Sequence, residues 1–248
     1  MATFILVHGG FHGGWCWSHV TPHLVRAGHK AVAPDLPGHG DDQTPQSHVT
    51  FDMAVSQVAA LVQQAPEPVV LVGHSMSGLV ISQVAERFPD RIGMLVWIAA
   101  FLVPTGSSVQ SYLEAHADLG HSDVLPNAVP SDDDTHISFR VEKAREVFYN
   151  TTPVALAEQA AKRLGSTALP YLVSPISLSK ENFGRVPRTY VICLQDRALP
   201  ISLHRKMIAD SPCQHVFELN SDHSPFFSQP RQLSECLLHL VKGEILHG

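Results

Sequence analysis

Charged side chains are scarce in this chain. Asp, Glu, Lys and Arg make up 16% of its 248 residues, whereas globular proteins average about a quarter. The 17 Lys and Arg residues are scattered and the net charge is −6, which argues against a basic face that would bind nucleic acid phosphates. Apolar residues make up 44%, so the composition excludes a disordered or fibrous chain and indicates a large buried core.

Long apolar runs and closely spaced cysteine pairs are also missing. The longest apolar run, residues 93–103, ends at Pro104 and is shorter than the roughly 20 residues that span a bilayer, so we expect no membrane partner. No basic segment precedes the apolar residues 4–7, and we therefore expect no signal peptide and a cytoplasmic location. The 4 cysteines show no Cys-x-x-Cys spacing and are expected to be reduced thiols.

The 16 histidines raise the question of a metal site. The sequence contains no His-Glu-x-x-His segment and no Cys/His ligand spacing. His8 and His12 are four residues apart, but Gly9 and Gly10 between them argue against a helix that would align the two rings. We therefore expect no metal ion.

Short apolar runs alternate with helical patterns in the N-terminal part of the chain. The expected strands cover residues 4–7, 31–33, 69–72 and 94–98, and the expected helices cover residues 17–27, 53–62 and 79–88. Continuous apolar strands separated by helices are typical of a parallel sheet that is buried on both faces. The alternation resumes near the C-terminus, with strands at 189–194 and 216–219 and helices at 201–208 and 232–241.

The alternation breaks after the fourth strand. No comparable strand run occurs in residues 104–186, where a polar stretch rich in Asp and Pro precedes two helical patterns, at residues 121–134, 141–149 and 154–164. We expect an α/β core made of residues 1–103 and 187–248. The segment between them is then a cap or lid that sits over the sheet and carries the substrate specificity.

A candidate nucleophile lies in the segment Gly-His-Ser-Met-Ser-Gly at residues 73–78. This segment follows the strand 69–72 and precedes a helix, and a serine on such a turn exposes its hydroxyl above the sheet. The helix start also aims backbone N–H groups at the site. Gly73 and Ser77 are small enough for the turn, although Ser77 departs from the strict Gly-x-Ser-x-Gly pattern. Ser75 is therefore the expected nucleophile.

A serine nucleophile needs a histidine base, and position along the chain selects one. His223 follows the last expected strand, in the polar loop after residue 219. Loops after parallel strands emerge at the carboxyl edge of the sheet, where Ser75 also emerges. Three other histidines lie in expected connections or helices, and their positions give no such reason to choose them as the base: His39, His204 and His215.

The third member of such a site is a carboxylate that fixes the imidazole tautomer. Asp196 closely follows the strand 189–194 and reaches the same edge of the sheet. Asp222 is adjacent to His223 and cannot easily reach the ring of its neighbour, and Asp210 lies at a helix end. The chain order of serine, then acid, then histidine is the one expected for a hydrolase of this architecture.

An oxyanion hole needs two N–H groups about 3 Å from the developing negative charge. Met76, the residue after the nucleophile, is expected to supply one. The other is expected from the glycine loop after the first strand, where we assign it to Gly10 and regard Phe11 as the less favoured choice.

Several of these segments resemble the α/β hydrolases, and specifically the plant methylesterase and hydroxynitrile lyase group. The resemblance covers nearly the whole chain and rests on residues 4–17 (FILVHGGFHGGWCW), 70–78 (VLVGHSMSG), 98–104 (IAAFLVP), 191–200 (VICLQDRALP) and 221–223 (SDH). It implies an α/β-hydrolase fold, in which a mostly parallel sheet is flanked by helices and a cap follows the fourth strand. It also implies an esterase that uses no cofactor and often forms a homodimer.

The same group contains two chemistries, and three positions separate them. Hydroxynitrile lyases of the group have a lysine after the catalytic histidine, a threonine after the first-strand histidine and a cysteine after the nucleophile. This chain has Ser224, Gly9 and Met76 there. Without a cation near the site a departing cyanide has little to stabilise it, so these positions favour the esterase.

The sequence therefore predicts a serine carboxylesterase. Its expected partners are small, largely apolar carboxylic esters, methyl esters among them, which react through an acyl-enzyme. Phe11 and Ser224 are the candidate pocket residues. The alternatives are a hydroxynitrile lyase or another C–C lyase on the same scaffold, and a ligand-binding receptor with a hydrolase fold. Thioester, lactone and amide substrates stay open.

Overall fold

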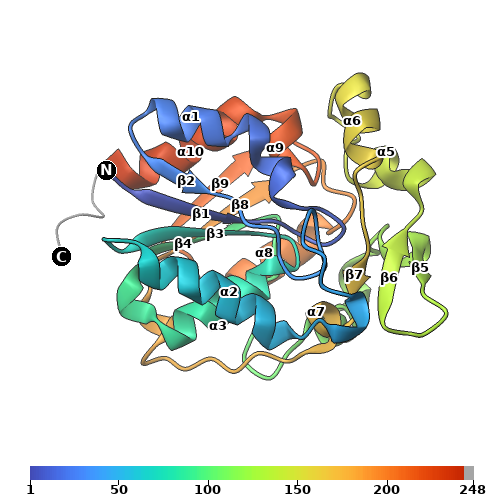
Figure 1. Ribbon diagram of the computed structural model, residues 1–248, viewed down its shortest axis with the longest axis horizontal. Helices are drawn as coiled ribbons and strands as arrows, with labels where there is room; N and C mark the ends of the chain where they lie inside the picture. Colours follow the sequence, from blue (N-terminus) through green and yellow to red (C-terminus); the bar gives the residue numbers. More distant parts are fainter. Residues whose placement is uncertain (243–248) are drawn as a thin grey trace.

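A parallel sheet forms the centre of the molecule. The computed structural model describes residues 1–242, so residues 243–248 of the predicted core lie outside the described part. The main sheet has the strand order β2-β1-β3-β4-β8-β9, with β1 at Thr3–Val7, β2 at Lys30–Val32, β3 at Val69–His74, β4 at Ile92–Ile98, β8 at Arg188–Cys193 and β9 at His215–Leu219. All neighbouring strands pair in parallel, so their carboxyl ends meet at one edge (Figure 1). Every strand predicted for the core is present.

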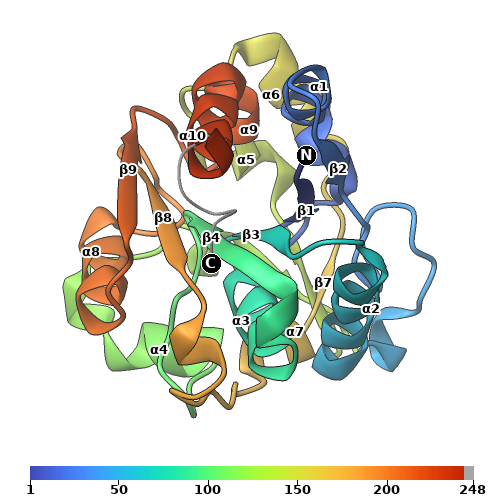
Figure 2. The same ribbon diagram turned by 90° about the vertical axis from the view of Figure 1, so that its left-hand side faces the viewer.

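Helices cover both faces of this sheet, as Figures 1 and 2 show. One face carries α1 (Thr21–Arg26) and α10 (Pro230–Lys242), and the other carries α2 (Phe51–Gln64), α3 (Ser77–Arg87) and α8 (Ile201–Asp210). Because successive strand residues point to opposite faces, Phe4 and Leu6 enter one buried cluster and Ile5 and Val7 enter the other. The continuous apolar strands are explained by this burial on both sides.

The predicted helix at residues 17–27 divides into two. A 3₁₀ helix, η1, covers Gly14–His19, and α1 begins at Thr21 with Pro22 in its first turn. Proline has no N–H to continue the preceding turn, and its fixed φ suits the start of a new helix. Gly28 then follows with a φ of 86°, which fits its predicted place as a helix stop.

The segment between β4 and β8 contains a second, small sheet that the sequence does not reveal. Its strands β5 (Ala128–Pro130), β6 (His136–Phe139) and β7 (Thr167–Ala168) pair antiparallel. They are only 3, 4 and 2 residues long, too short for a recognisable apolar run. The helices of the segment are α4 (Val109–Ala115), α5 (Ala144–Val147), α6 (Val154–Ala161) and α7 (Pro170–Val173).

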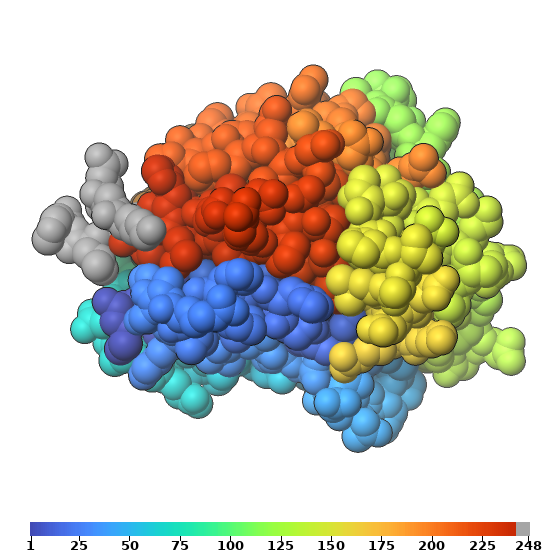
Figure 3. Space-filling view, turned by 90° about the horizontal axis from the view of Figure 1, so that it is seen from above, coloured from blue at the N-terminus to red at the C-terminus, as the bar shows by residue number. Residues whose placement is uncertain are grey.

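Much of this segment lies beyond the carboxyl edge of the main sheet. In Figure 1 the strands β5–β7 and the helices α5 and α6 stand at the end of the sheet opposite the N-terminus. Figure 3 shows yellow and green atoms of this segment gathered at one end of the molecule, beside blue atoms of the N-terminal part and red atoms of the C-terminal part of the chain. This is the edge at which the candidate site residues emerge. Within residues 1–242, no helix has the length and apolar character needed to cross a membrane.

Candidate active site

Ser75 occupies a tight turn between β3 and α3. The strand ends at His74, the helix begins at Ser77, and Ser75 itself has a φ of 53°. A positive φ is uncommon for a residue other than glycine and is typical of a nucleophile held on a strand-to-helix turn. A Cβ added at Gly73 would lie 2.9 Å from the Ser77 carbonyl oxygen, so the turn requires a glycine there.

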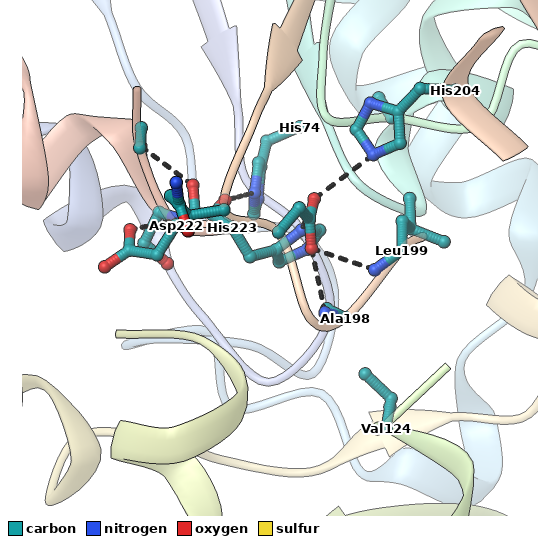
Figure 4. Close-up of polar contacts among 12 residues, drawn as sticks. His74, Val124, Ala198, Leu199, His204, Asp222 and His223 are labelled. Carbon is teal, nitrogen blue, oxygen red and sulfur yellow. Dashed lines mark hydrogen bonds and ion pairs between the residues drawn. The ribbon is translucent and has the colours of Figure 1, made fainter. Parts of the chain in front are cut away.

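The structure brings Asp196 and His223 together. Oδ2 of Asp196 lies 2.7 Å from Nδ1 of His223, and the side chains of Asp196 and His223 are 0% and 2% exposed. The other oxygen, Oδ1, accepts hydrogen bonds from the backbone N–H groups of Ala198 (2.8 Å) and Leu199 (2.9 Å), as Figure 4 shows. The turn after β8 therefore fixes the carboxylate with its second oxygen facing the imidazole.

The same carboxylate oxygen has a second histidine neighbour. Nε2 of His204, from α8, lies 3.2 Å from Asp196 Oδ2, an ion-pair distance at which the ring is not fully aligned for a hydrogen bond. Burial by itself raises the pKa of Asp196, but the charge of His223 and the contacts with His204 outweigh burial and hold this pKa below its ordinary value. Asp196 is therefore ionised throughout the neutral range.

Ser75 and His223 both line a single apolar cavity of about 470 Å³. Gly10, Met76 and Phe11 line it as well, whereas Ser224 is not among its lining residues. The segment between β4 and β8 contributes much of the wall, through apolar residues that include Val109, Leu113, Ile137, Phe148, Leu169 and Leu172. Cavities of this size, with a few convergent polar groups, are typical of small-molecule sites.

The backbone N–H groups next to Ser75 differ in what they bind. Within residues 1–242, the N–H groups of Gly10 and Met76 donate to no other residue. The N–H of Phe11, by contrast, donates to Thr167 Oγ1 at 2.8 Å. Free N–H groups at the cavity wall can donate hydrogen bonds to a negative oxygen, so this difference favours Gly10 over Phe11. The turn is also tied to this loop, because Ser77 Oγ donates to the His8 carbonyl oxygen.

Two further buried histidines, His74 and His12, lie beside the site. Nε2 of His74 donates to the His223 carbonyl oxygen at 2.8 Å, and the two rings lie 4.6 Å apart. His12 lies between the Gly10 carbonyl oxygen (2.7 Å) and the Tyr149 hydroxyl (2.8 Å). Burial lowers the pKa of His74 well below its ordinary value and lowers that of His12 to about 4. Both rings are neutral at pH 7 and pack against the site as uncharged groups.

Two histidines without a predicted role are buried in the structure. His204 and His39 have no evident role in the sequence, yet both are fully buried in the structure: His204 lies against Asp196, and Nε2 of His39 lies 3.2 Å from Thr167 Oγ1. His215, which the sequence analysis places in a connection or helix, is the first residue of β9 and is exposed. A helix that begins four residues after the Asp196 turn was the available signal for His204.

The rejected carboxylates and the pocket candidate Ser224 lie away from the imidazole. Asp222 accepts hydrogen bonds from the Thr151 N–H (2.9 Å), the Thr152 hydroxyl (2.9 Å) and the Ser224 N–H (3.0 Å). Asp210 pairs with Lys206 on the solvent side of α8. Ser224 is fully buried, and its hydroxyl has no hydrogen-bond partner in the described part of the chain. No group of three His, Cys, Asp or Glu side chains within residues 1–242 is arranged to hold a metal ion.

The α/β hydrolase family model matches residues 4–235. The chain belongs to the α/β hydrolase family. This hydrolase is 32% identical to methylesterase 1 of Arabidopsis thaliana over 250 residues, which cover 96% of this chain and 95% of the relative. It spans 64% of the length of another relative from the same plant, the chloroplastic methylesterase 11. Its structure matches that of polyneuridine aldehyde esterase with a TM-score of 0.87 at 25% identity, covering 98% of this chain and 100% of the other.

These relatives confirm the fold predicted from the sequence, the resemblance to plant methylesterases and the assignment to the carboxylic ester hydrolases. The lyase and receptor alternatives are not favoured by them.

Proposed function

We propose that this hydrolase cleaves largely apolar carboxylic esters through an acyl-enzyme formed on Ser75. The observation that carries the proposal is the buried Asp196–His223 contact of 2.7 Å at the wall of the cavity that Ser75 also lines. A serine on a strained turn and a histidine oriented by a carboxylate are the parts that nucleophilic ester cleavage requires.

In the acylation step, Ser75 Oγ attacks the ester carbonyl carbon while His223 Nε2 takes the hydroxyl proton. Asp196 keeps the proton of His223 on Nδ1 and stabilises the imidazolium that forms. The negative oxygen of the tetrahedral intermediate receives hydrogen bonds from the N–H groups of Gly10 and Met76. His223 then returns its proton to the leaving alcohol.

Deacylation repeats these roles with water as the nucleophile. His223 takes one proton from the water, and the hydroxide attacks the acyl carbon of the ester that links the acyl group to Ser75. Collapse of the second tetrahedral intermediate releases the carboxylic acid and restores the serine hydroxyl with the proton held by His223. The proposed steps use no metal or cofactor.

The cavity favours neutral, apolar esters. Its lining contains no lysine or arginine, and its one carboxylate, Glu114, is exposed and accepts a hydrogen bond from Gln110. A free carboxylate on the acid part of a substrate would therefore find no cation, whereas hydrocarbon groups would be desolvated against apolar side chains. The names of the relatives, methylesterase and polyneuridine aldehyde esterase, support methyl esters of apolar acids as the first substrates to examine.

In this proposal the chain consists of a catalytic core and a cap. Residues 1–103 and 187–248 form the catalytic core, and residues 104–186 form a cap that supplies most of the apolar wall of the cavity. Two further predictions stay with it: a cytoplasmic location, which a fluorescent fusion would test, and a homodimer, which light scattering during gel filtration would test.

The decisive experiment is a panel of methyl and p-nitrophenyl esters hydrolysed by the wild type, by Ser75→Ala and by Ser56→Ala. Ser56 lies on the solvent face of α2 and serves as the matched control. We expect Ser75→Ala to keep its fold and lose at least a hundredfold in kcat, and Ser56→Ala to match the wild type. A fluorophosphonate should label the wild type at Ser75 in peptide mass spectrometry. Substantial hydrolysis by Ser75→Ala would refute the proposal.

A further inference from the structure

The carboxylate of Asp196 contacts two histidines, of which ester cleavage uses one. His223 Nδ1 and His204 Nε2 lie 2.7 Å and 3.2 Å from the same oxygen, Oδ2. His204 belongs to α8, whereas His223 belongs to the loop after β9, so the two rings reach the carboxylate from different elements (Figure 4). The side chains of Asp196 and His204 are both 0% exposed.

The surroundings of His204 determine where its ring proton lies. Within residues 1–242, neither of its nitrogens has any other hydrogen-bond partner. A neutral imidazole carries one N–H, and a buried N–H without an acceptor is unfavourable. The acceptor within reach is Asp196 Oδ2, opposite Nε2. The Tyr190 ring packs edge-on against the imidazole with centroids 5.7 Å apart and limits its rotation.

We propose that His204 is a positioning residue for the hydrolysis, which donates its Nε2–H to Asp196 Oδ2. The N–H groups of Ala198 and Leu199 hold Oδ1, so His204 completes a set of donors that leaves the carboxylate one orientation, the one that His223 needs. His204 also takes a share of the carboxylate charge. It thereby limits how strongly Asp196 attracts the imidazolium form of His223.

Other titratable groups lie around Asp196, His204 and His223. Burial lowers the pKa of His74 well below its ordinary value and that of His12 to about 4. Burial likewise raises the pKa values of Tyr190 and Cys193 well above their ordinary values. The carboxylate of Asp222 is turned to Thr151, Thr152 and the Ser224 N–H. His74, His12, Tyr190 and Cys193 therefore keep their charge between about pH 5 and 8, and a shift of the acid limb in this range does not come from them.

The first test compares His204→Leu, which has no donor, with His204→Gln, whose amide retains an N–H. This test presumes the proposed esterase activity. For His204→Leu we expect kcat to fall about tenfold with little change in KM, because orientation of the base matters only in the transition state. We also expect the acid limb of kcat/KM to move to higher pH by about half a unit, since the whole carboxylate charge now acts on His223. His204→Gln should restore both.

Leu203→Ala is the matched control. Leu203 is buried in the same helix and packs in the cluster on that face of the sheet, so its truncation lowers stability without touching the carboxylate. We expect its acid limb to match that of the wild type. If His204→Leu also leaves the acid limb and kcat unchanged, or if His204→Gln restores neither, the positioning role is refuted.

The tautomer of His204 can be measured in the wild type, which does not depend on whether His204→Leu folds. In ¹⁵N-histidine-labelled wild type, with His204→Gln used to assign the signal, His204 should be the Nε2–H tautomer. An Nδ1–H tautomer would mean that it does not donate to Asp196 and would overturn the inference. Failure of the esterase proposal itself is distinguishable, because Ser75→Ala would then retain activity whatever His204 does.

Discussion

The backbone N–H of Phe11 donates a hydrogen bond of 2.8 Å to the hydroxyl of Thr167, although the two residues are 156 positions apart in the chain. The carbonyl oxygen of Phe11 accepts a second bond, of 2.8 Å, from the N–H of Gly165. Phe11 has a φ of 64°, an uncommon conformation for a residue with a side chain. The segment before and within β7 thus holds both polar groups of the residue that follows Gly10.

Thr167→Val should impair catalysis more than binding. Valine keeps the shape of threonine but cannot accept the Phe11 N–H, which leaves a buried donor unpaired at a cost of about 1–3 kcal/mol. The loop that carries Gly10 is then less well fixed, and we expect kcat to fall about tenfold while KM changes little. Steady-state kinetics on one ester, with Thr167→Ser as the variant that keeps the hydroxyl, measures this. Equal kcat in both variants would show that the hydroxyl does not position the loop.

Asp196→Asn and Asp210→Asn should differ by orders of magnitude. An amide at position 196 cannot hold the His223 tautomer, and we expect a loss of about 10⁴-fold in kcat. Asp210 pairs with Lys206 on a partly exposed face, where such pairs contribute about 0–1 kcal/mol to stability, and accepts a long hydrogen bond of 3.5 Å from the Tyr112 hydroxyl, so its amide variant should resemble the wild type. Activity assays on the two variants check this. The opposite order would place the catalytic acid at Asp210.

The sheet and the candidate triad could be predicted from the sequence for one physical reason. Strands buried on both faces appear as continuous apolar runs, and the ends of parallel strands converge, so residues just after such runs must lie close together. Ser75, Asp196 and His223 each follow a strand in this way, and their positions alone predict the Asp196–His223 contact that the structure contains.

Other contacts could not be predicted, because they join elements whose relative orientation the chain does not encode locally. His204 is one residue of an ordinary amphipathic helix, and only the packing of α8 turns it towards Asp196. Thr167 belongs to a strand of two residues, and its contact with Phe11 depends on how the inserted segment packs on the core. Ser224 is a candidate pocket residue by its position after His223, yet it is fully buried and does not line the cavity.

Stability should fall steeply as the pH is lowered. Burial lowers the pKa values of four histidines, to about 4 for His12 and His39 and well below the ordinary value for His8 and His74. The unfolded chain, with ordinary values near 6.5, binds protons that the folded chain does not, so each of these histidines lowers the free energy of unfolding by about 1.4 kcal/mol per pH unit below about pH 6.5. Above about pH 6.5 these histidines are neutral in both the folded and the unfolded chain, so the loss of stability is absent there.

Urea unfolding at several values between about pH 7 and pH 4.5 measures this slope. His39→Gln should make the dependence shallower by one proton, because its Nε2 and ring are replaced by a group that does not titrate. The exposed His48 is the matched control, and His48→Gln should leave the slope unchanged. A free energy of unfolding that is constant over this range would contradict the neutral, buried state of the four rings.

Gly9→Thr should inactivate the esterase and not convert it towards a lyase. A Cβ at Gly9 would lie 2.6 Å from His74 Nδ1 and 2.8 Å from Ser75 Cβ, closer than any such contact in folded proteins. The added side chain must displace the nucleophile turn, since His74 is held through its other nitrogen by the His223 carbonyl oxygen. Thermal unfolding and ester hydrolysis of Gly9→Ala and Gly9→Thr test this. Wild-type activity in Gly9→Ala would show that the turn tolerates the displacement.

Ser224→Lys tests the lyase alternative at the position after His223. Ser224 is 0% exposed and does not line the cavity, so the ammonium of a lysine there must be buried or must open the loop. We expect Ser224→Lys to lose stability and to cleave no mandelonitrile above the uncatalysed rate. Ser224→Ala is the matched control: it removes a buried hydroxyl that lacks a partner and should be at least as stable as the wild type, with full esterase activity. If Ser224→Lys instead folds as stably as the wild type and cleaves mandelonitrile, its side chain reaches the cavity, and one substitution then separates the two chemistries.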